Sequence, residues 1–161
     1  MNISILYHSE SGNTEEVAGV IESGSLKIEG IKTKVMSIRD ADIEFINSSK
    51  AIILGSPTYT GDMSWQMKSF LDKQNKINYQ GKLGAVFATE NFIGGGADSA
   101  LISILSHLLV KGMVVYSAGA SEGKPYTHFG AVCIQAGNKE QRARAEIFGE
   151  RIAKKTVELF A

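Results

Sequence analysis

Residues 9–14 combine side chains that suit the binding of a phosphate group. The segment 8–14 reads His-Ser-Glu-Ser-Gly-Asn-Thr and holds three hydroxyls, one amide and one glycine, but no lysine or arginine. It leads into a helical pattern, and the first N–H groups of a helix are unpaired and carry partial positive charge. Hydroxyls add donors, and glycine lets the backbone approach a ligand closely. We therefore expect a phosphate monoester to be held by Ser9, Glu10, Ser11, Gly12, Asn13 and Thr14.

An ordinary helix N-cap is the alternative interpretation of this segment, because Ser, Asn and Thr are also preferred as caps. One such residue is enough for a cap, whereas four are present here. The segment contains neither G-x-x-x-x-G-K-[ST] nor G-x-G-x-x-G, which excludes the two best-known phosphate loops.

A second segment, 55–63, reads Gly-Ser-Pro-Thr-Tyr-Thr-Gly-Asp-Met and offers a rigid turn, an aromatic ring and backbone amides. A flat heterocycle needs a ring to stack on and amides to bond its polar edge. The alternative is a simple turn with an exposed tyrosine. The candidate residues for binding such a heterocycle are Pro57, Thr58, Tyr59, Thr60 and Gly61.

A third segment, 89–96, ends in three consecutive glycines before another helical pattern. It is either a flexible joint or a loop whose backbone approaches the same ligand. The candidate residues are Thr89, Glu90, Asn91, Phe92, Gly94, Gly95 and Gly96.

Alternating apolar runs and helical periods predict the elements that position these segments. Strands are expected at 3–7, 31–38, 51–55, 83–89 and 113–116, with Pro57 ending the third. Helices are expected at 13–29, 65–73, 98–111 and 140–160. Residues 131–135 are strand-like again after the polar loop 117–130, so an insertion interrupts the fifth strand.

This order predicts an α/β fold, with a three-layer, doubly wound, five-stranded parallel sheet. The length of 161 residues favours a single domain, 1–161. Ligands of such sheets bind at the carboxyl ends of the strands. The three segments above follow strands one, three and four, so they should meet at that edge.

Composition narrows the possible partners and the compartment. Lys plus Arg equals Asp plus Glu at 17 each, so we expect no nucleic-acid partner. No apolar run is long enough for a bilayer, and residues 1–7 lack a basic signal region, so we expect no membrane association. Cys133 is the only cysteine, which excludes an internal disulfide and favours the cytoplasm. The three histidines lie apart, so no metal site is expected.

The sequence resembles the flavodoxin superfamily from Ile3 to about Ile134. Residues 9–14 fit the family's phosphate pattern, [ST]-x-[ST]-G-x-[ST], which wraps the 5′-phosphate of FMN. Residues 55–72, the triple glycine and Gly112-Met113-Val114 are similar to the tryptophan-repressor-binding-protein type of NAD(P)H:quinone reductases. The resemblance implies a flavodoxin-like FMN protein in which the loop 89–96 lies against the flavin and FMN carries the chemistry. No catalytic side chain is needed.

The resemblance leaves two functions open. The first is an FMN-dependent oxidoreductase that passes electrons from NAD(P)H to a quinone or similar acceptor, as a possible homodimer or tetramer. The alternative is a flavodoxin-type electron carrier between protein partners, with no NAD(P)H activity of its own. Val110 and Lys111 replace the His-His pair usual in the reductases, which weakens the first. The zero net charge departs from the acidic flavodoxins, which weakens the second.

A phospho-acceptor receiver domain is excluded, because strands one and three do not end in aspartates.

A few further residues have less specific interpretations. Trp65 either caps the flavin pocket or, as we expect, packs under the preceding loop. Tyr126 and His128 lie in the insertion and could line a substrate or nicotinamide site. Cys133 is expected to be buried, and His8 receives no role.

Overall fold

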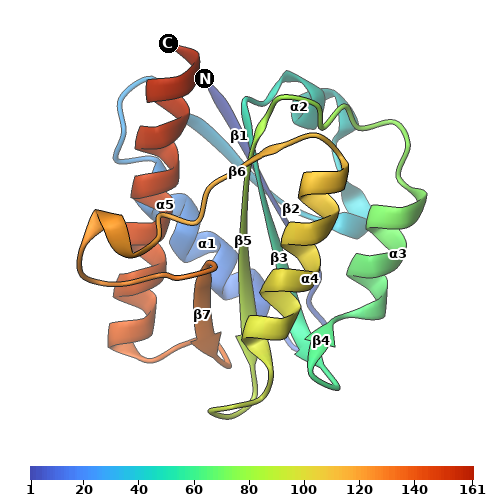
Figure 1. Ribbon diagram of the computed structural model, residues 1–161, viewed down its shortest axis with the longest axis vertical. Helices are drawn as coiled ribbons and strands as arrows, with labels where there is room; N and C mark the ends of the chain where they lie inside the picture. The colour runs from blue at the N-terminus through green and yellow to red at the C-terminus, as the bar shows by residue number, and fades with distance from the viewer.

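The computed structural model describes all residues, 1–161, and forms a parallel sheet with the strand order β2-β1-β3-β5-β6. The strands are β1 (Asn2–Tyr7), β2 (Lys32–Ser37), β3 (Ala51–Tyr59), β5 (Leu83–Glu90) and β6 (Val114–Val115). Two pieces lie off this path, since β4 (Asp62–Met63) pairs with β3 and β7 (Ala131–Ile134) pairs with β5. Figure 1 shows the strands fanning between two layers of helices, which confirms the predicted three-layer α/β architecture.

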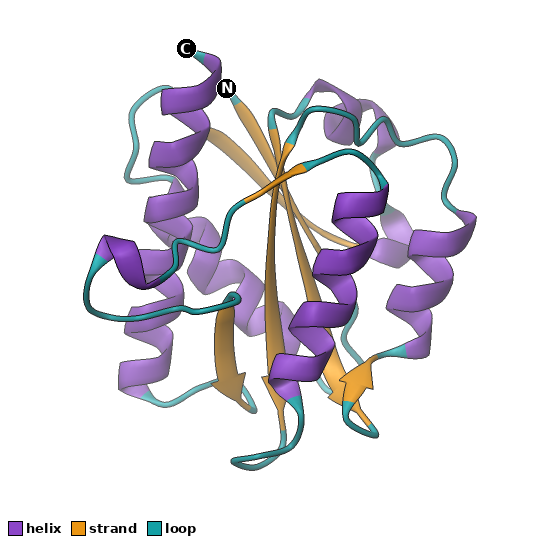
Figure 2. Cartoon of the chain, viewed as in Figure 1, coloured by secondary structure: helices purple, strands orange, loops and turns teal.

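The two faces of the sheet are covered by different helices (Figure 2). One face packs against α1 (Asn13–Ser25) and α5 (Lys139–Phe160), and its core includes Ile5, Ile21 and Phe148. The other packs against α2 (Ile43–Ser48), α3 (Trp65–Lys73) and α4 (Ala97–Val110), around Leu54 and Met67. Both cores are apolar, so the hydrophobic effect holds each helix on its own face. No helix has the length and apolar character that a bilayer crossing demands.

The insertion in the fifth strand is present as predicted. β6 pairs with β5 at Leu83 and Gly84, and β7 pairs with the same strand from Phe87 to Glu90. The intervening loop contains the short 3-10 helix η2 (Ala120–Glu122). Arg151 of α5 holds this loop through four backbone carbonyls, at 2.8–3.4 Å from its guanidinium nitrogens.

The structure extends β3 beyond its predicted end, through Pro57 to Tyr59. β1 pairs with β3 only as far as Gly55, whereas β5 pairs with it to Pro57. Beyond Gly55 one side of β3 therefore has no parallel neighbour, and a proline without an N–H is tolerated there. The strand then turns through Thr60 and Gly61, both at positive φ, into the unpredicted β4. Positive φ at both turn residues is typical of a tight type I′ hairpin.

Two helical segments also depart from the predictions. α1 ends at Ser25 instead of residue 29, and α2 with the 3-10 helix η1 (Ile38–Asp40) was not predicted at all. α2 has only six residues, too few for a helical period to be recognised, although the side chain of Asp42 caps it by accepting from Phe45 N.

Candidate functional site

The three predicted segments meet at the carboxyl edge of the sheet. The register aligns Tyr7 with Gly55 and Pro57 with Thr89, so the loops after β1, β3 and β5 emerge side by side. They enclose a cavity of about 130 Å³. It is lined by Ser9, Glu10, Ser11, Asn13, Thr14, Pro57, Thr58, Tyr59, Thr89, Glu90, Asn91 and Gln135. The other predicted residues, Gly12, Thr60, Gly61, Phe92, Gly94, Gly95 and Gly96, lie in the same loops but do not line it.

The start of α1 leaves its backbone donors free. Its N-cap is Gly12, at φ +90°, and no side chain caps the helix. The N–H of Gly12 itself donates to Ser9 Oγ at 3.0 Å, which fixes the turn. By contrast, α3 and α5 are capped by the side chains of Ser64 and Asn138. The open start of α1 therefore supplies N–H groups and a positive dipole end to an anion in the cavity.

Buried hydroxyls complete the wall beside α1. Thr14 Oγ1 and Thr89 Oγ1 lie 2.8 Å apart and are almost fully buried, which ties the first loop to the third. Thr58 Oγ1 is buried with no hydrogen-bond partner. A buried hydroxyl left unpaired is costly, so this atom fits a site that receives a polar ligand. Together these donors suit a phosphate monoester.

Glu10 is held by residues that the sequence did not assign to the site. Its Oε1 accepts from Arg39 Nη2 at 2.9 Å and from Gln66 Nε2 at 3.1 Å. His8 Nε2 lies 2.9 Å from the same oxygen, but off the direction needed for a hydrogen bond. Burial lowers the pKa of His8, although the nearby Glu10 carboxylate opposes this. Arg39 comes from η1, 29 residues further along the chain, so no local spacing could have revealed it.

Two glycines bring the hairpin and the third loop together. Gly96 has φ +100°, and a Cβ built on it would lie 2.7 Å from Gly61 Cα. Glu90 Oε2 accepts from Ala97 N at 3.1 Å, so its carboxylate is turned to the start of α4. Tyr59 lines the cavity at the hairpin, while Phe92 is 66% exposed on the third loop. Two aromatic side chains thus stand on the loops at either side of the cavity.

The structure places the remaining sequence candidates outside the cavity. Trp65 is 71% exposed, so the expectation that it packs under the preceding loop is wrong. Tyr126 and His128 face each other in the insertion, with ring centroids 6.4 Å apart, and neither lines the cavity. Cys133 is buried, and burial raises its pKa to about 11.

Gln135 is a cavity residue that the sequence analysis missed. It follows β7 at φ +52°, and its N–H donates to Glu90 O at 2.7 Å. The predicted segments followed strands one, three and four, and no residue after strand five was named. The polar Gln135 directly after the apolar run 131–134 was the available signal.

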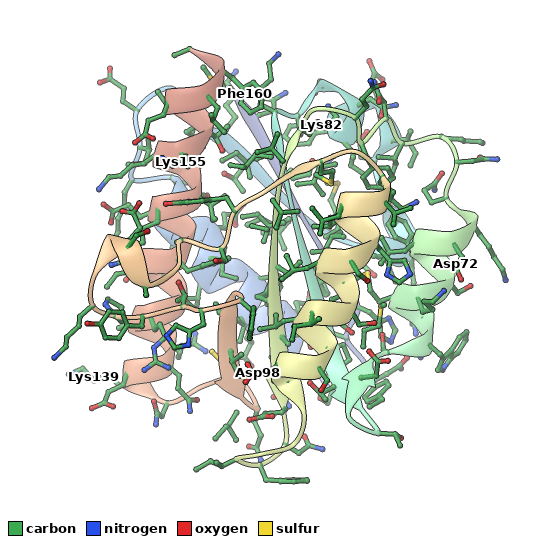
Figure 3. All side chains as sticks on the ribbon, viewed as in Figure 1. Asp72, Lys82, Asp98, Lys139, Lys155 and Phe160 are labelled. Carbon is green, nitrogen blue, oxygen red and sulfur yellow. The ribbon has the colours of Figure 1, made fainter.

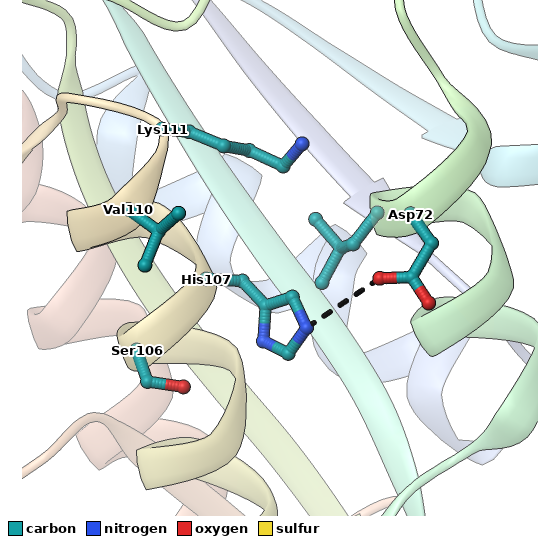
Figure 4. Close-up of a pocket in the computed structure, with 6 residues that line it drawn as sticks. Asp72, Ser106, His107, Val110 and Lys111 are labelled. Atoms are coloured by element: carbon teal, nitrogen blue, oxygen red, sulfur yellow. Dashed lines mark ion pairs between the residues drawn. The ribbon is translucent and has the colours of Figure 1, made fainter.

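A larger groove of about 380 Å³ lies between α3 and α4 (Figure 4). It is lined by Leu71, Asp72, Ser106, His107, Val110 and Lys111. These residues come from the C-terminal halves of helices that run back from the carboxyl edge, so the groove is remote from the cavity. Its polar groups are already paired: His107 Nδ1 lies 2.7 Å from Ser103 O, and Lys68 forms an ion pair with Asp72.

The doubly wound sheet, the uncapped start of α1 and the aromatic hairpin together define a flavodoxin-like protein. The Flavodoxin family profile matches residues 5–156. A flavodoxin from Clostridium saccharobutylicum is 48% identical over 99% of this chain and 100% of its own length. An NAD(P)H dehydrogenase (quinone) from Archaeoglobus fulgidus is 26% identical over 94% of this chain and 95% of its own. A flavodoxin, WrbA-like protein from Agrobacterium tumefaciens shares the fold, with a TM-score of 0.81, 21% identity and 98% coverage of both chains.

The chain belongs to the flavodoxin family, because the profile spans nearly all of it and a full-length relative is close. Flavodoxins bind FMN, so the predicted cofactor is confirmed. The residues present fit that cofactor, since an open helix start and the unpaired Thr58 hydroxyl face a cavity at the carboxyl edge.

Proposed function

We propose that the protein is an electron carrier that shuttles electrons between protein partners and has no NAD(P)H activity of its own. The observation that carries this proposal is the 48% identity to a flavodoxin over the full length of both chains. On sequence alone, the NAD(P)H oxidoreductase was placed first and the carrier second. The carrier is now the favoured function, because the resemblance to quinone reductases corresponds to a relative of only 26% identity.

In this proposal residues 9–14 hold the phosphate of FMN, and the loops 57–61 and 89–96 flank its ring. The chain contributes donors from the start of α1 and the hydroxyl of Thr58. Tyr59 and Phe92 offer apolar surface beside the buried sheet. When bound, FMN supplies the redox chemistry, and the protein orients it and sets its environment.

The zero net charge does not oppose a carrier role, because it still allows a local excess of acidic side chains, although Arg39, Lys139 and Arg142 also lie at the carboxyl edge. Glu10, Glu15, Glu16, Asp62 and Asp98 are exposed on the loops and first helical turns of the carboxyl edge. Lys32, Lys50 and Lys82 lie at the opposite edge, where β2, β3 and β5 begin. Figure 3 shows Asp98 and Lys82 toward opposite ends of the sheet. Carboxylates there that form no ion pair, such as Asp62 and Asp98, would favour basic redox partners over acidic ones.

A second candidate is the NAD(P)H:quinone oxidoreductase, favoured by the relative from Archaeoglobus fulgidus and by the similarity of residues 55–72. It would require room for a nicotinamide or a quinone beside the flavin. In this function Tyr59 and Phe92 would contact the second substrate.

An anaerobic titration of the FMN-loaded protein with NADPH and then NADH distinguishes the two functions. For a carrier we expect the visible flavin absorbance to persist, while dithionite bleaches the same sample and proves that the flavin can be reduced. Rapid bleaching by either nicotinamide would overturn the carrier proposal and direct the search to quinone acceptors.

A further inference from the structure

Glu10 places a carboxylate in the cavity that is proposed to receive the FMN phosphate. It is one of the lining residues and is 49% exposed. A phosphate monoester carries up to two negative charges at neutral pH, so an unscreened carboxylate in the same cavity would repel it. The inference below rests on the proposed placement of the phosphate at residues 9–14.

The contacts of Glu10 converge on one of its two oxygens. Arg39 Nη2 and Gln66 Nε2 both donate to Oε1, at 2.9 and 3.1 Å. No other residue donates a hydrogen bond to Glu10. The carboxylate is therefore tied to η1 and α3.

Arg39 is the only one of these neighbours that carries a permanent positive charge. Gln66 is neutral, and burial lowers the pKa of His8 below its usual range, which favours the neutral imidazole. The other nearby guanidinium, on Arg142, pairs with Glu16 at 3.3 Å and does not contact Glu10. A guanidinium keeps its charge throughout the accessible pH range.

We propose that Arg39 is a positioning residue that neutralises Glu10 and so lets the phosphate of FMN share the cavity with this carboxylate. The Arg39–Glu10 pair makes the site selective for the phosphorylated flavin. Without Arg39, the Glu10 carboxylate would repel the phosphate of FMN, whereas riboflavin has no phosphate to be repelled. Glu10 in turn ties the phosphate loop to η1 and α3.

The test measures the affinity of the apoprotein for FMN and for riboflavin, which lacks the phosphate, by quenching of flavin fluorescence. In Arg39→Gln at low salt we expect FMN affinity to fall about three- to tenfold, since both partners are partly exposed to solvent. Riboflavin affinity should stay unchanged. The loss should shrink at about 1 M salt, where screening is strong.

Three further variants establish the cause. Glu10→Gln removes the repelling charge, so adding Arg39→Gln to it should have little further effect on FMN affinity. Arg39→Lys keeps the charge and should retain most of the affinity. Lys154→Gln breaks an exposed ion pair with Glu150 in the C-terminal half of α5, away from the cavity, and should leave the ratio of FMN to riboflavin affinity at the wild-type value.

Two outcomes would overturn the inference. Equal losses of FMN and riboflavin affinity in Arg39→Gln would show that the arginine only supports the loop structure. An unchanged FMN affinity would show that solvent alone screens Glu10. Thr14→Val separates this failure from that of the phosphate site: if Thr14→Val lowers FMN affinity and Arg39→Gln does not, only the role of Arg39 is refuted.

Discussion

The cavity at the carboxyl edge is smaller than the groove between α3 and α4, and the two also differ in how far their polar groups are paired. The groove measures about 380 Å³ and the cavity about 130 Å³. In the groove, His107 and Asp72 already have protein partners. In the cavity, the start of α1 has no side-chain cap and Thr58 Oγ1 has no partner.

Unmet hydrogen-bonding capacity therefore favours the cavity over the groove as a ligand site, although the groove has the larger volume. Native proteins pair nearly all their buried polar groups, so an unpaired group in a concave wall is informative. The following predictions test this contrast by changing residues of the cavity and comparing them with matched positions elsewhere.

The largest effect is expected where two loops of the cavity touch. Gly96→Ala places a Cβ 2.7 Å from Gly61 Cα and strains a residue at φ +100°. We expect unfolding in urea to show a stability loss of about 2–4 kcal/mol, with FMN affinity reduced as the loops part. Gly94→Ala is the matched control, because that residue has φ +80° but open space around it, and should cost about 1–2 kcal/mol. Equal losses in both variants would refute the steric explanation.

The next effect concerns the hydroxyl of the phosphate loop. Thr14→Val should lower FMN affinity about tenfold or more, since a hydrogen bond to a charged group is worth about 1.5–3 kcal/mol. Flavin fluorescence quenching measures this, and riboflavin affinity should change much less. Thr89→Val breaks the same 2.8 Å hydroxyl contact from the other side. It should leave the ratio of FMN to riboflavin affinity unchanged. An unaltered FMN affinity in Thr14→Val would contradict the phosphate site.

A smaller, pH-dependent effect on stability is expected from His8, which directly precedes residues 9–14. Burial lowers the pKa of His8 in the folded state, so the unfolded chain binds its proton more tightly. The contribution of neutral His8 to the free energy of unfolding should therefore be fully present above the unfolded pKa of about 6.5, and it should be lost as pH falls through the folded pKa. The slope contributed by one proton is at most about 1.4 kcal/mol per pH unit. His8→Asn should flatten urea-derived stability between neutral pH and pH 5. A slope identical to that of the wild type would assign the acid sensitivity to other groups.

The smallest effect is expected in the groove. Asp72→Asn removes an exposed ion pair with Lys68, and such pairs contribute little because solvent screens them. We expect no resolvable change in the thermal midpoint and no change in FMN affinity. A loss of FMN affinity here would break the contrast between the two regions.

Much of the fold could be predicted because each decisive signal is local. The helix 65–73 was predicted at its observed bounds, and the interrupted fifth strand was predicted from two short apolar runs flanking a polar loop. β3 was predicted too short, since whether Pro57 can lie in a strand depends on which neighbours that strand has. α2 was missed because six residues do not make a recognisable period.

The candidate site divides in the same way. Residues 9–14 carry their signal in composition and spacing, and the structure brings five of these six to the cavity wall. Arg39 and Gln66 could not be predicted, because each reaches Glu10 only through the packing of η1 and α3 around one loop. His8 is close to Glu10 in sequence, but it had been given no role. The close approach of Gly61 and Gly96 could not be predicted either, because they lie 35 residues apart in sequence, and their contact with a ligand stays a prediction.

The sequence by itself determined the order of the main strands and helices, the three candidate loops and the side-chain composition of residues 9–14, because hydrophobic period and side-chain type act over a few residues. Only the tertiary structure decided which charge lies beside Glu10 and how closely two loops approach. Those properties depend on distances between residues far apart in sequence, and packing alone sets these distances.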